Sequence, residues 1–116
     1  MSRQISGPGT GMWSTRAKML RPRGGVNGIA AYGCFYVWGG ESAAATEPNG
    51  VFPDHDVYNP KTDQWTALAR LPTPIHGVTG AAFVDGIIYI PGGGTMQGGS
   101  SGSTIFQVYR PDVRCE

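Results

Sequence analysis

Short apolar runs of strand length alternate with turns rich in glycine and proline along the whole chain. Residues 26–31 and 34–38 flank a turn at Gly33, and residues 78–84 and 87–90 flank an Asp-Gly turn. Aromatic and β-branched side chains dominate the runs, as strands prefer, and such turns are typical of β-hairpins. Further strands are predicted at residues 56–58, 64–68 and 105–109. No stretch keeps an apolar period of 3.6 residues, so the pattern indicates an all-β chain.

The same landmarks recur after 51 to 53 residues. Trp13 has a counterpart in Trp65, and the Gly-Gly pair at 39–40 has one in the pair at 92–93. Self-similarity at a fixed period of this size is the signature of a repeat architecture. Other pairs that keep the offset are Met19 and Leu71, Pro22 and Pro74, Gly25 and Gly77, Gly28 and Gly80, Ala30 and Ala82, and Tyr58 and Tyr109.

Each repeat unit contains four short strands, which is the number in one blade of a β-propeller. The innermost strand of a blade lies where neighbouring blades crowd together, so it requires small residues, and both units supply glycine and alanine there. The outer strands need large side chains to fill the wider space. We therefore predict that four aromatic residues pack between blades: Trp13, Tyr58, Trp65 and Tyr109.

These motifs resemble the kelch repeat. Residues 35–40 read Phe-Tyr-Val-Trp-Gly-Gly and are followed by Tyr58-Asn59-Pro60 and Trp65, while residues 88–93 again end in Gly92-Gly93. The segment 71–77 is similar to the one that precedes an inner strand in bacterial kelch proteins and galactose-oxidase-like propellers. The family usually has arginine where Ile75 stands, and Arg23 keeps it in the first unit. The resemblance implies a kelch-type β-propeller with two four-stranded blades per chain.

The strands divide into two blades that are cut out of phase. We expect a flexible N-terminal segment (1–11), an outer strand (12–20), a complete blade (25–68) and three strands of an open blade (77–110). Because two blades cannot close a ring, copies of the chain are expected to associate head to tail, with strand 12–20 of one copy completing the open blade of the next. Three copies, giving six blades, are favoured over four. The alternative is a fragment of a larger kelch protein.

Composition narrows the function classes. The net charge is +1 and 15% of the residues are charged. Because the basic residues form no cluster, no nucleic-acid partner is expected. No run approaches the ~20 apolar residues of a membrane span. A secretory signal is not evident at the start, so a cytoplasmic protein without a membrane partner is expected.

The two cysteines form neither a disulfide framework nor metal-ligand spacing. Cys34 is expected to pack as a small apolar residue, and Cys115 to be exposed. The glycine-rich stretch 92–102 lacks a following helix and a P-loop lysine, so it is predicted to be a flexible loop rather than a phosphate cradle. No metal and no cofactor are predicted.

Four loops exceed the usual length of hairpin connections, which is 2–5 residues. They cover residues 18–24, 41–54, 70–76 and 94–103, and the resemblance implies that they share the face on which ligands bind. Long loops on a rigid scaffold often carry function. The candidate ligand-binding residues on these loops are Arg21, Arg23, Glu41, Arg70 and His76.

Arg23 and His76 stand at nearly equivalent positions, so a ring would repeat them around its axis as anchors for an anionic or polar ligand. In the alternative interpretation Arg23 bonds loop carbonyls and His76 caps a turn. Glu41 is expected to form a structural pair with Arg23. The neighbours His55 and Asp56 point to opposite faces of a strand, which disfavours a metal site or a base.

These observations favour a non-catalytic scaffold that binds its own copies and a protein or carbohydrate ligand. The resemblance leaves open a carbohydrate-active enzyme of the sialic-acid mutarotase or galactose oxidase kind. A copper oxidase is disfavoured because Cys34 lies in a blade strand, away from the axis. A mutarotase would need Arg, Glu and His groups that converge at the tunnel. No catalytic residue is predicted.

Overall fold

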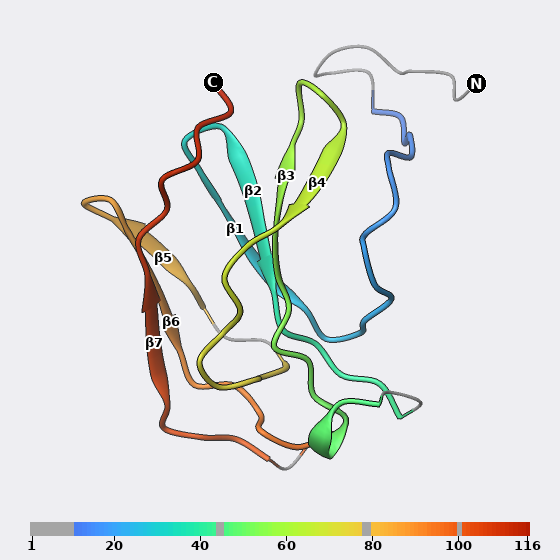
Figure 1. Ribbon diagram of the computed structural model, residues 1–116, viewed down its shortest axis with the longest axis vertical. Helices are drawn as coiled ribbons and strands as arrows, with labels where there is room; N and C mark the ends of the chain where they lie inside the picture. The colour runs from blue at the N-terminus through green and yellow to red at the C-terminus, as the bar shows by residue number, and fades with distance from the viewer. Residues whose placement is uncertain (1–10, 44–45, 78–79, 100) are drawn as a thin grey trace.

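The computed structural model describes residues 11–43, 46–77, 80–99 and 101–116. Within them seven strands form two antiparallel sheets (Figure 1). The first sheet contains, in spatial order, β1 (Asn27–Ala31), β2 (Cys34–Trp38), β3 (His55–Asn59) and β4 (Gln64–Ala67). The second sheet contains β5 (Ala82–Val84), β6 (Ile87–Pro91) and β7 (Phe106–Tyr109).

The prediction of an all-β chain is confirmed. A single 3-10 turn, η1 (Pro48–Gly50), interrupts the loop after β2, and the described part of the chain has no α-helix. It also has no helix with the length and hydropathy of a membrane span. The predicted segment 1–11 lies, except for Gly11, outside the described residues, as does the start of the strand predicted at 78–84.

Each sheet begins with a tight hairpin whose two turn residues have positive φ. The values are 53° for Tyr32 and 76° for Gly33, and 51° for Asp85 and 81° for Gly86. Two successive residues in this region match the right-handed twist of the flanking strands, which is why such turns are favoured in two-residue hairpins. The turns fix the registers of β1 on β2 and of β5 on β6.

The observed register corrects one part of the repeat alignment. Ile29 lies opposite Tyr36 in the first sheet, and Ala82 lies opposite Tyr89 in the second. Tyr36 and Tyr89 are 53 residues apart in the sequence. The structural counterpart of Ala82 is therefore Ile29 rather than Ala30.

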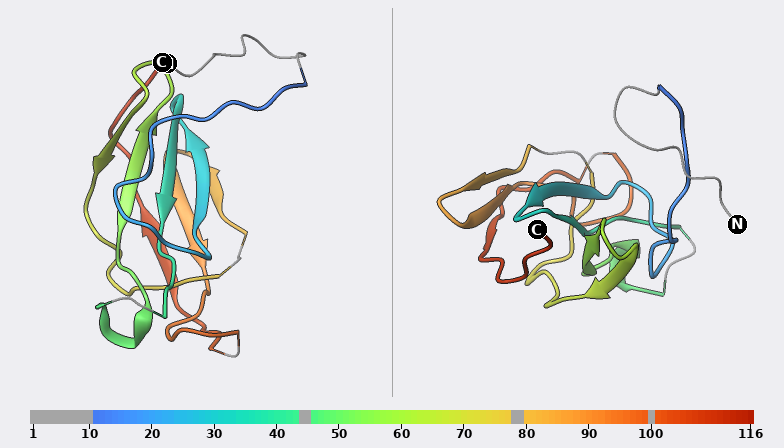
Figure 2. Two further views of the ribbon diagram at one scale, coloured as in Figure 1. Left: turned by 90° about the vertical axis from the view of Figure 1, so that its right-hand side faces the viewer. Right: turned by 90° about the horizontal axis from the view of Figure 1, so that it is seen from above.

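The core lies between the two sheets, which face each other (Figure 2). One face of the first sheet, here called its forward face, bears Tyr36, Trp38 and Val57. It packs against the face of the second sheet that bears Ile88 and Ile90, and all five side chains are buried. Because successive strand residues point to opposite faces, each sheet also has a second face that does not meet the other sheet.

A disulfide joins Cys34, at the start of β2, to Cys115. Cys34 is buried in the apolar core as expected, but it is not a free thiol, and Cys115 is only 5% exposed, which corrects the expectation that it is exposed. The C-terminal tail (residues 110–116) lies between the sheets when seen from above (Figure 2). There the Cys115 N–H donates to the Tyr32 carbonyl over 2.9 Å. The two cysteines meet because the tail crosses to the first sheet.

Residues 12–20, named the N-terminal arm, form no strand in this chain. The arm is attached to the first sheet at Ala17, which accepts a hydrogen bond from the Trp65 indole over 2.9 Å. Trp13 is 96% exposed. Pairing of this segment with a neighbouring blade stays a prediction.

Candidate functional site

The long loops gather at one end of the molecule, the lower end in Figure 1, here called the loop end. In the first repeat Gly24 and Glu41 exchange backbone hydrogen bonds of 3.0 and 2.8 Å. In the second repeat His76 and Gly94 exchange bonds of 2.9 and 2.7 Å. Each repeat thus brings the segment before its first strand, β1 or β5, against the segment that follows its second strand, β2 or β6.

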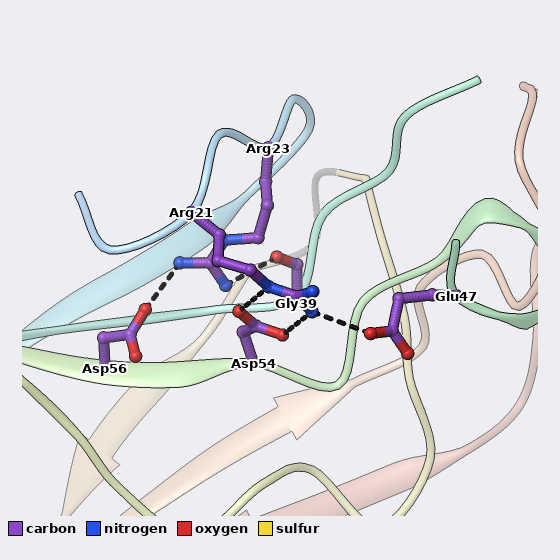
Figure 3. A network of polar contacts seen from close by, with 6 residues as sticks. All are labelled: Arg21, Arg23, Gly39, Glu47, Asp54 and Asp56. Atoms are coloured by element: carbon purple, nitrogen blue, oxygen red, sulfur yellow. Dashed lines mark hydrogen bonds and ion pairs between the residues drawn. The ribbon is translucent and has the colours of Figure 1, made fainter. Parts of the chain in front are cut away.

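The Arg23 guanidinium is buried beneath the loop end (Figure 3). Its Nη2 donates to Asp56 Oδ2 over 2.7 Å, and its Nη1 donates to the Gly39 carbonyl over 3.0 Å. Burial raises the pKa of Asp56, and the Arg23 charge opposes that shift. The expected pair of Arg23 with Glu41 is therefore wrong, because the guanidinium forms its ion pair with Asp56 on β3.

Arg21 forms a second and more exposed network beside the first (Figure 3). Its Nε and Nη2 donate to Asp54 over 2.9 and 2.7 Å, and Nη2 also donates to Glu47 over 2.8 Å. The guanidinium stacks on the Phe52 ring, 4.7 Å from its centre. The hydrogen bonds from Arg21 hold the pKa of Asp54 below its usual range. This bidentate contact orders the loop after β2.

Glu41 instead reaches the second repeat. Its Oε2 lies 3.2 Å from His76 Nδ1, an ion-pair distance without hydrogen-bond alignment, and its Oε1 accepts a hydrogen bond from Gly98 N–H over 2.9 Å. The His76 side chain is 7% exposed and the Glu41 side chain 28%. This carboxylate therefore connects the two repeats at the loop end.

Glu41, His76 and Ser101 stand in the order acid, imidazole and hydroxyl that a nucleophilic triad uses. In such a triad the imidazole Nε2 must be free to take the serine proton. Here His76 Nε2 lies 2.6 Å from the Met96 carbonyl and 3.3 Å from Ser101 Oγ, which itself donates to the same carbonyl over 2.7 Å. A carbonyl can only accept, so Nε2 carries a proton. This arrangement does not activate Ser101.

An open hollow of about 380 Å³ lies beside His76. Apart from this ring its walls consist of glycine backbone and the side chains of Ser101 and Ser103. Backbone amides and hydroxyls both donate and accept hydrogen bonds, so the hollow suits a polar ligand. The stretch 92–102, predicted as a flexible loop, supplies most of these walls. The hydroxyl of the next residue, Ser103, donates to the Gly93 carbonyl over 2.7 Å.

His55 lies between the sheets, not at the loop end. Its Nδ1 lies 2.9 Å from the Ala69 carbonyl, and its ring meets the Tyr109 ring edge-on with centres 4.5 Å apart. Burial lowers the pKa of His55. As predicted, His55 and its neighbour Asp56 turn to different surroundings. No cluster of three or more potential metal-ligating side chains occurs among the described residues.

The structure sorts the five predicted ligand-binding residues into three groups. Arg21 and Arg23 bond to the acidic side chains of the loop after β2 and of β3, and Glu41 faces His76. Arg70 is exposed, and its charge contributes to the lowered pKa of Asp54. Their role in ligand binding stays a prediction.

Comparison with known proteins shows which proteins this chain is similar to. No family model matches the chain. Kelch-like protein terF of Aspergillus terreus is 34% identical over 102 residues, which cover 87% of this chain and 22% of that protein. Kelch-like ECH-associated protein 1A of Danio rerio is 35% identical over 86 residues, covering 74% and 14%. Kelch-like protein 15 of Homo sapiens is 37% identical over 108 residues, covering 89% and 17%.

The chain consists of kelch repeats. It spans less than a quarter of the length of each of these three curated relatives. The similarity extends over most of this chain, so it includes both repeats rather than one motif.

Two of the kelch-motif glycines are required by close approach. A Cβ on Gly40 (φ 117°) would lie 2.8 Å from the Arg23 Cβ, and one on Gly93 (φ 101°) would lie 2.9 Å from the Ile75 Cβ. Both positions also have a φ that side-chain-bearing residues rarely adopt. In each kelch repeat the second glycine thus makes room for the residue two positions before Gly25 or Gly77. The first glycines, Gly39 and Gly92, also have positive φ.

Sequence reasoning missed several polar residues of the site, among them Asp54, Asp56 and Ser101. A signal for the first two was present, because the acidic residues flank His55 just before the motif tyrosine, at a point where a buried strand was predicted. A charge in a buried strand requires a partner. Ser101 carries no comparable signal in a stretch of glycines and serines.

Proposed function

We propose that the chain is a non-catalytic kelch-repeat scaffold whose two sheets act as propeller blades, stack with further blades, and present the loop end to a protein or carbohydrate ligand. The proposal depends on one observation, which is an asymmetry in burial between equivalent residues of the two sheets.

The forward face of the first sheet is covered and its counterpart in the second sheet is not. Tyr36 and Val57 lie opposite each other, and so do their counterparts Tyr89 and Val108. Tyr36 is 0% and Val57 is 4% exposed, because they pack against the second sheet. Val108 is 57% exposed, and Tyr89 is only half-buried. The forward face of the second sheet thus has the residues of an interface without its partner.

The rear face of the first sheet shows the reverse. Phe35 precedes Tyr36 and points to the opposite face, where it is 43% exposed. Its counterpart Ile88, which precedes Tyr89, is 0% exposed because it packs against the first sheet. Phe35 is thus exposed at a position whose counterpart is covered within the chain, while Val37 and Tyr58 on the same face are buried at 3% and 9% exposure.

Within the chain the forward face of the first sheet packs against the rear face of the second. The same kind of contact can form between two copies, with the forward face of the second sheet of one copy against the rear face of the first sheet of the next. Such a head-to-tail contact uses two different surfaces and closes into a ring when the rotation per copy fits. Three copies supply the blades of a six-bladed propeller. Exposed apolar side chains on both faces support this reading, since contiguous patches of this kind mark interaction sites.

Light scattering on a sizing column tests the assembly. We expect a mass near three chains for the 116-residue protein. Val108→Asp places a charge on the free forward face and should return the mass to one chain with the β-sheet signal intact. Lys61→Asp, in the exposed turn after β3, is the matched control and should leave the mass unchanged. A folded single-chain mass for the parent protein would overturn the proposed assembly.

The non-catalytic part of the proposal rests on His76. Its Nε2, the ring nitrogen nearest Ser101, points at the Met96 carbonyl, which can only accept, so this nitrogen carries a proton and cannot take one from the Ser101 hydroxyl. The hollow beside it is therefore proposed as a place for hydrogen bonding to a ligand. Binding of immobilised glycans or peptides that weakens in Ser103→Ala would support this use of the loop end. Hydrolysis or isomerisation of a bound ligand would contradict it.

A further inference from the structure

The second sheet lacks the strand that completes the first. In the first sheet β4 pairs antiparallel with β3, whereas β7, the counterpart of β3, has β6 on one side and no strand on the other among the described residues. An unpaired edge presents free backbone donors and acceptors to another chain. Two residues of β7, Phe106 and Val108, are 62% and 57% exposed. The edge is therefore open to a further strand.

The N-terminal arm stands one repeat length before β4 in the sequence, so it is the counterpart of the strand that completes the first sheet. Trp13 precedes Trp65 of β4 by 52 residues, and Arg23 precedes its counterpart Ile75 by the same number. Residues 13–15 therefore correspond to residues 65–67 of β4. Trp65 packs its ring against Tyr58 with centres 5.0 Å apart, but Trp13 has 96% of its surface in solvent.

The arm is held on the rear side of the first sheet. Both backbone groups of Ala17 are bonded there: its N–H donates to Asp63 Oδ1 over 2.9 Å, and its carbonyl accepts from the Trp65 indole over 2.9 Å. The same Asp63 oxygen accepts from the Tyr58 hydroxyl over 2.7 Å. Tyr58 and Trp65 share the rear face with Phe35. The arm thus lies where the preceding blade would stack.

The arm and β7 lie on opposite sides of the molecule. In Figure 1 the arm runs along the right-hand edge and β7 lies at the left, with the first sheet between them. The view from above in Figure 2 shows the same separation. While Ala17 stays attached to Asp63 and Trp65, the arm cannot reach its own β7. The arm of a second copy is free of this restriction and can reach that edge.

We propose that the arm of a second copy pairs antiparallel with β7, in the register that β4 has on β3. Tyr58 lies opposite Trp65, and Val57 opposite Thr66. Transferred by the repeat offsets, these pairs place Trp13 of the second copy opposite Tyr109 and Ser14 opposite Val108. The inference rests on the proposed stacking of copies and adds to it the strand that joins them and its register.

Disulfide trapping between two single-cysteine variants tests this register. Ser14→Cys and Val108→Cys proteins, carrying different affinity tags, are mixed and oxidised, and the products are separated on a non-reducing gel. We expect a covalent dimer that contains both tags, because residues directly opposite each other have Cβ atoms only about 5 Å apart. The native pair Cys34–Cys115 is already bonded within each copy.

The matched control moves one cysteine by one residue. Thr15→Cys mixed with Val108→Cys should give at least tenfold less mixed dimer, because neighbouring strand residues point to opposite faces. Equal trapping by both pairs in a protein of trimeric mass would overturn the register and leave the stacking proposal intact. A parent protein that stays a single chain would overturn both proposals.

Trp13→Ala gives a second measurement that does not depend on cysteine chemistry. An aromatic residue that fills an interface pocket commonly dominates the binding energy. We expect the dissociation constant of the assembly to rise at least tenfold, with the β-sheet signal and the thermal midpoint of the dissociated chain unchanged. An unchanged dissociation constant would overturn the role of the arm.

Discussion

At the same place in the two sheets, one repeat buries an ion pair and the other an aliphatic side chain. Arg23 of the first repeat lies over Gly40 and bonds Asp56, whereas Ile75 of the second lies over Gly93. The residue that replaces the aspartate is Gln107, which is buried as well. The two repeats therefore keep one backbone geometry with two different chemistries.

The difference shows that the two positions depend on each other. Gln107 uses its neutral amide to bind both backbone groups of Thr73, accepting from the N–H over 2.9 Å and donating to the carbonyl over 3.1 Å. An aspartate at that position would be left without a partner beside Ile75. A buried charge that loses its partner costs far more than a neutral pair does. The charges are consequently present together in one repeat and absent together in the other.

The largest loss of stability is expected when the covalent link between the sheets is removed. Cys34→Ser with Cys115→Ser, or reduction of the parent protein, should lower the free energy of unfolding by about 4 kcal/mol, because the disulfide closes a long loop in the unfolded chain. Urea unfolding with and without reductant measures this. A loss of less than about 1 kcal/mol would show that the bond does not constrain the unfolded state. Disulfides persist in oxidising compartments and are rare in the cytoplasm, so this bond does not support the expected cytoplasmic location. That location stays a prediction.

The next effect comes from converting one repeat into the other. Arg23→Ile alone should cost about 3 kcal/mol of unfolding free energy, because it leaves Asp56 buried without its partner. Adding Asp56→Gln, which copies the second repeat, should recover most of that loss. A double-mutant cycle followed by urea unfolding measures the coupling. If the double variant is no more stable than Arg23→Ile, the two positions are independent and the comparison fails.

A smaller effect concerns pH, at another position where the repeats differ. His55 corresponds to Phe106 of the second sheet. Burial lowers the pKa of His55 from its ordinary 6.5, so the unfolded chain takes up the proton first. The free energy of unfolding should therefore be highest above pH 6.5 and fall below it, by at most about 1.4 kcal/mol per pH unit.

Unfolding measured from pH 4 to 7.5 tests this dependence. His55→Phe, which copies the second sheet, should show a shallower decline over that range than the parent protein. The same slope in both proteins would assign the acid sensitivity to another group. The lowered pKa of Asp54 acts at lower pH, because the carboxyl starts from 3.8.

The smallest effect is expected at the contact between the repeats. Glu41→Gln removes a partly exposed charge that faces His76, and pairs of this kind contribute less than about 1 kcal/mol. Ser101→Ala should be similarly mild, and neither variant should change the rate at which the protein hydrolyses an activated ester. A drop in that rate in both variants would reinstate the triad chemistry that the Met96 carbonyl opposes.

Local pattern explains why the strands could be predicted. Short apolar runs and the turns at Gly33 and Gly86 are encoded within a few residues, and most observed strands match the predicted ones to within one residue. The exceptions are β5, which begins at Ala82 although a strand was predicted from residue 78, and residues 12–20, which form no strand in this chain. The register was less accessible, because the offset between repeats changes from 52 at Trp13 and Trp65 to 53 at the glycine pairs. Only the hydrogen-bonded ladder shows that Ala82 corresponds to Ile29.

Pairings between distant residues could not be predicted. Arg23 and Asp56 are 33 residues apart and lie on different elements, and Glu41, the partner that was expected for Arg23, stands nearer to it in the sequence. Cys34 and Cys115 are separated by 81 residues, and two cysteines alone do not say whether the tail returns to the first sheet. The Glu41–His76 contact joins two repeats, so its prediction requires the way in which they stack.

The disulfide also makes the chain a lariat. Its covalent ring contains β2 to β7, and only the first 33 residues and Glu116 lie outside it. A force that pulls the two ends apart would detach the arm and peel off β1, extending the chain by roughly 110 Å at about 3.5 Å per residue. The remaining strands would carry no load until the bond is reduced, after which roughly 280 Å of further chain would be released. Under tension, this small protein would yield in two steps, and reduction would control the second.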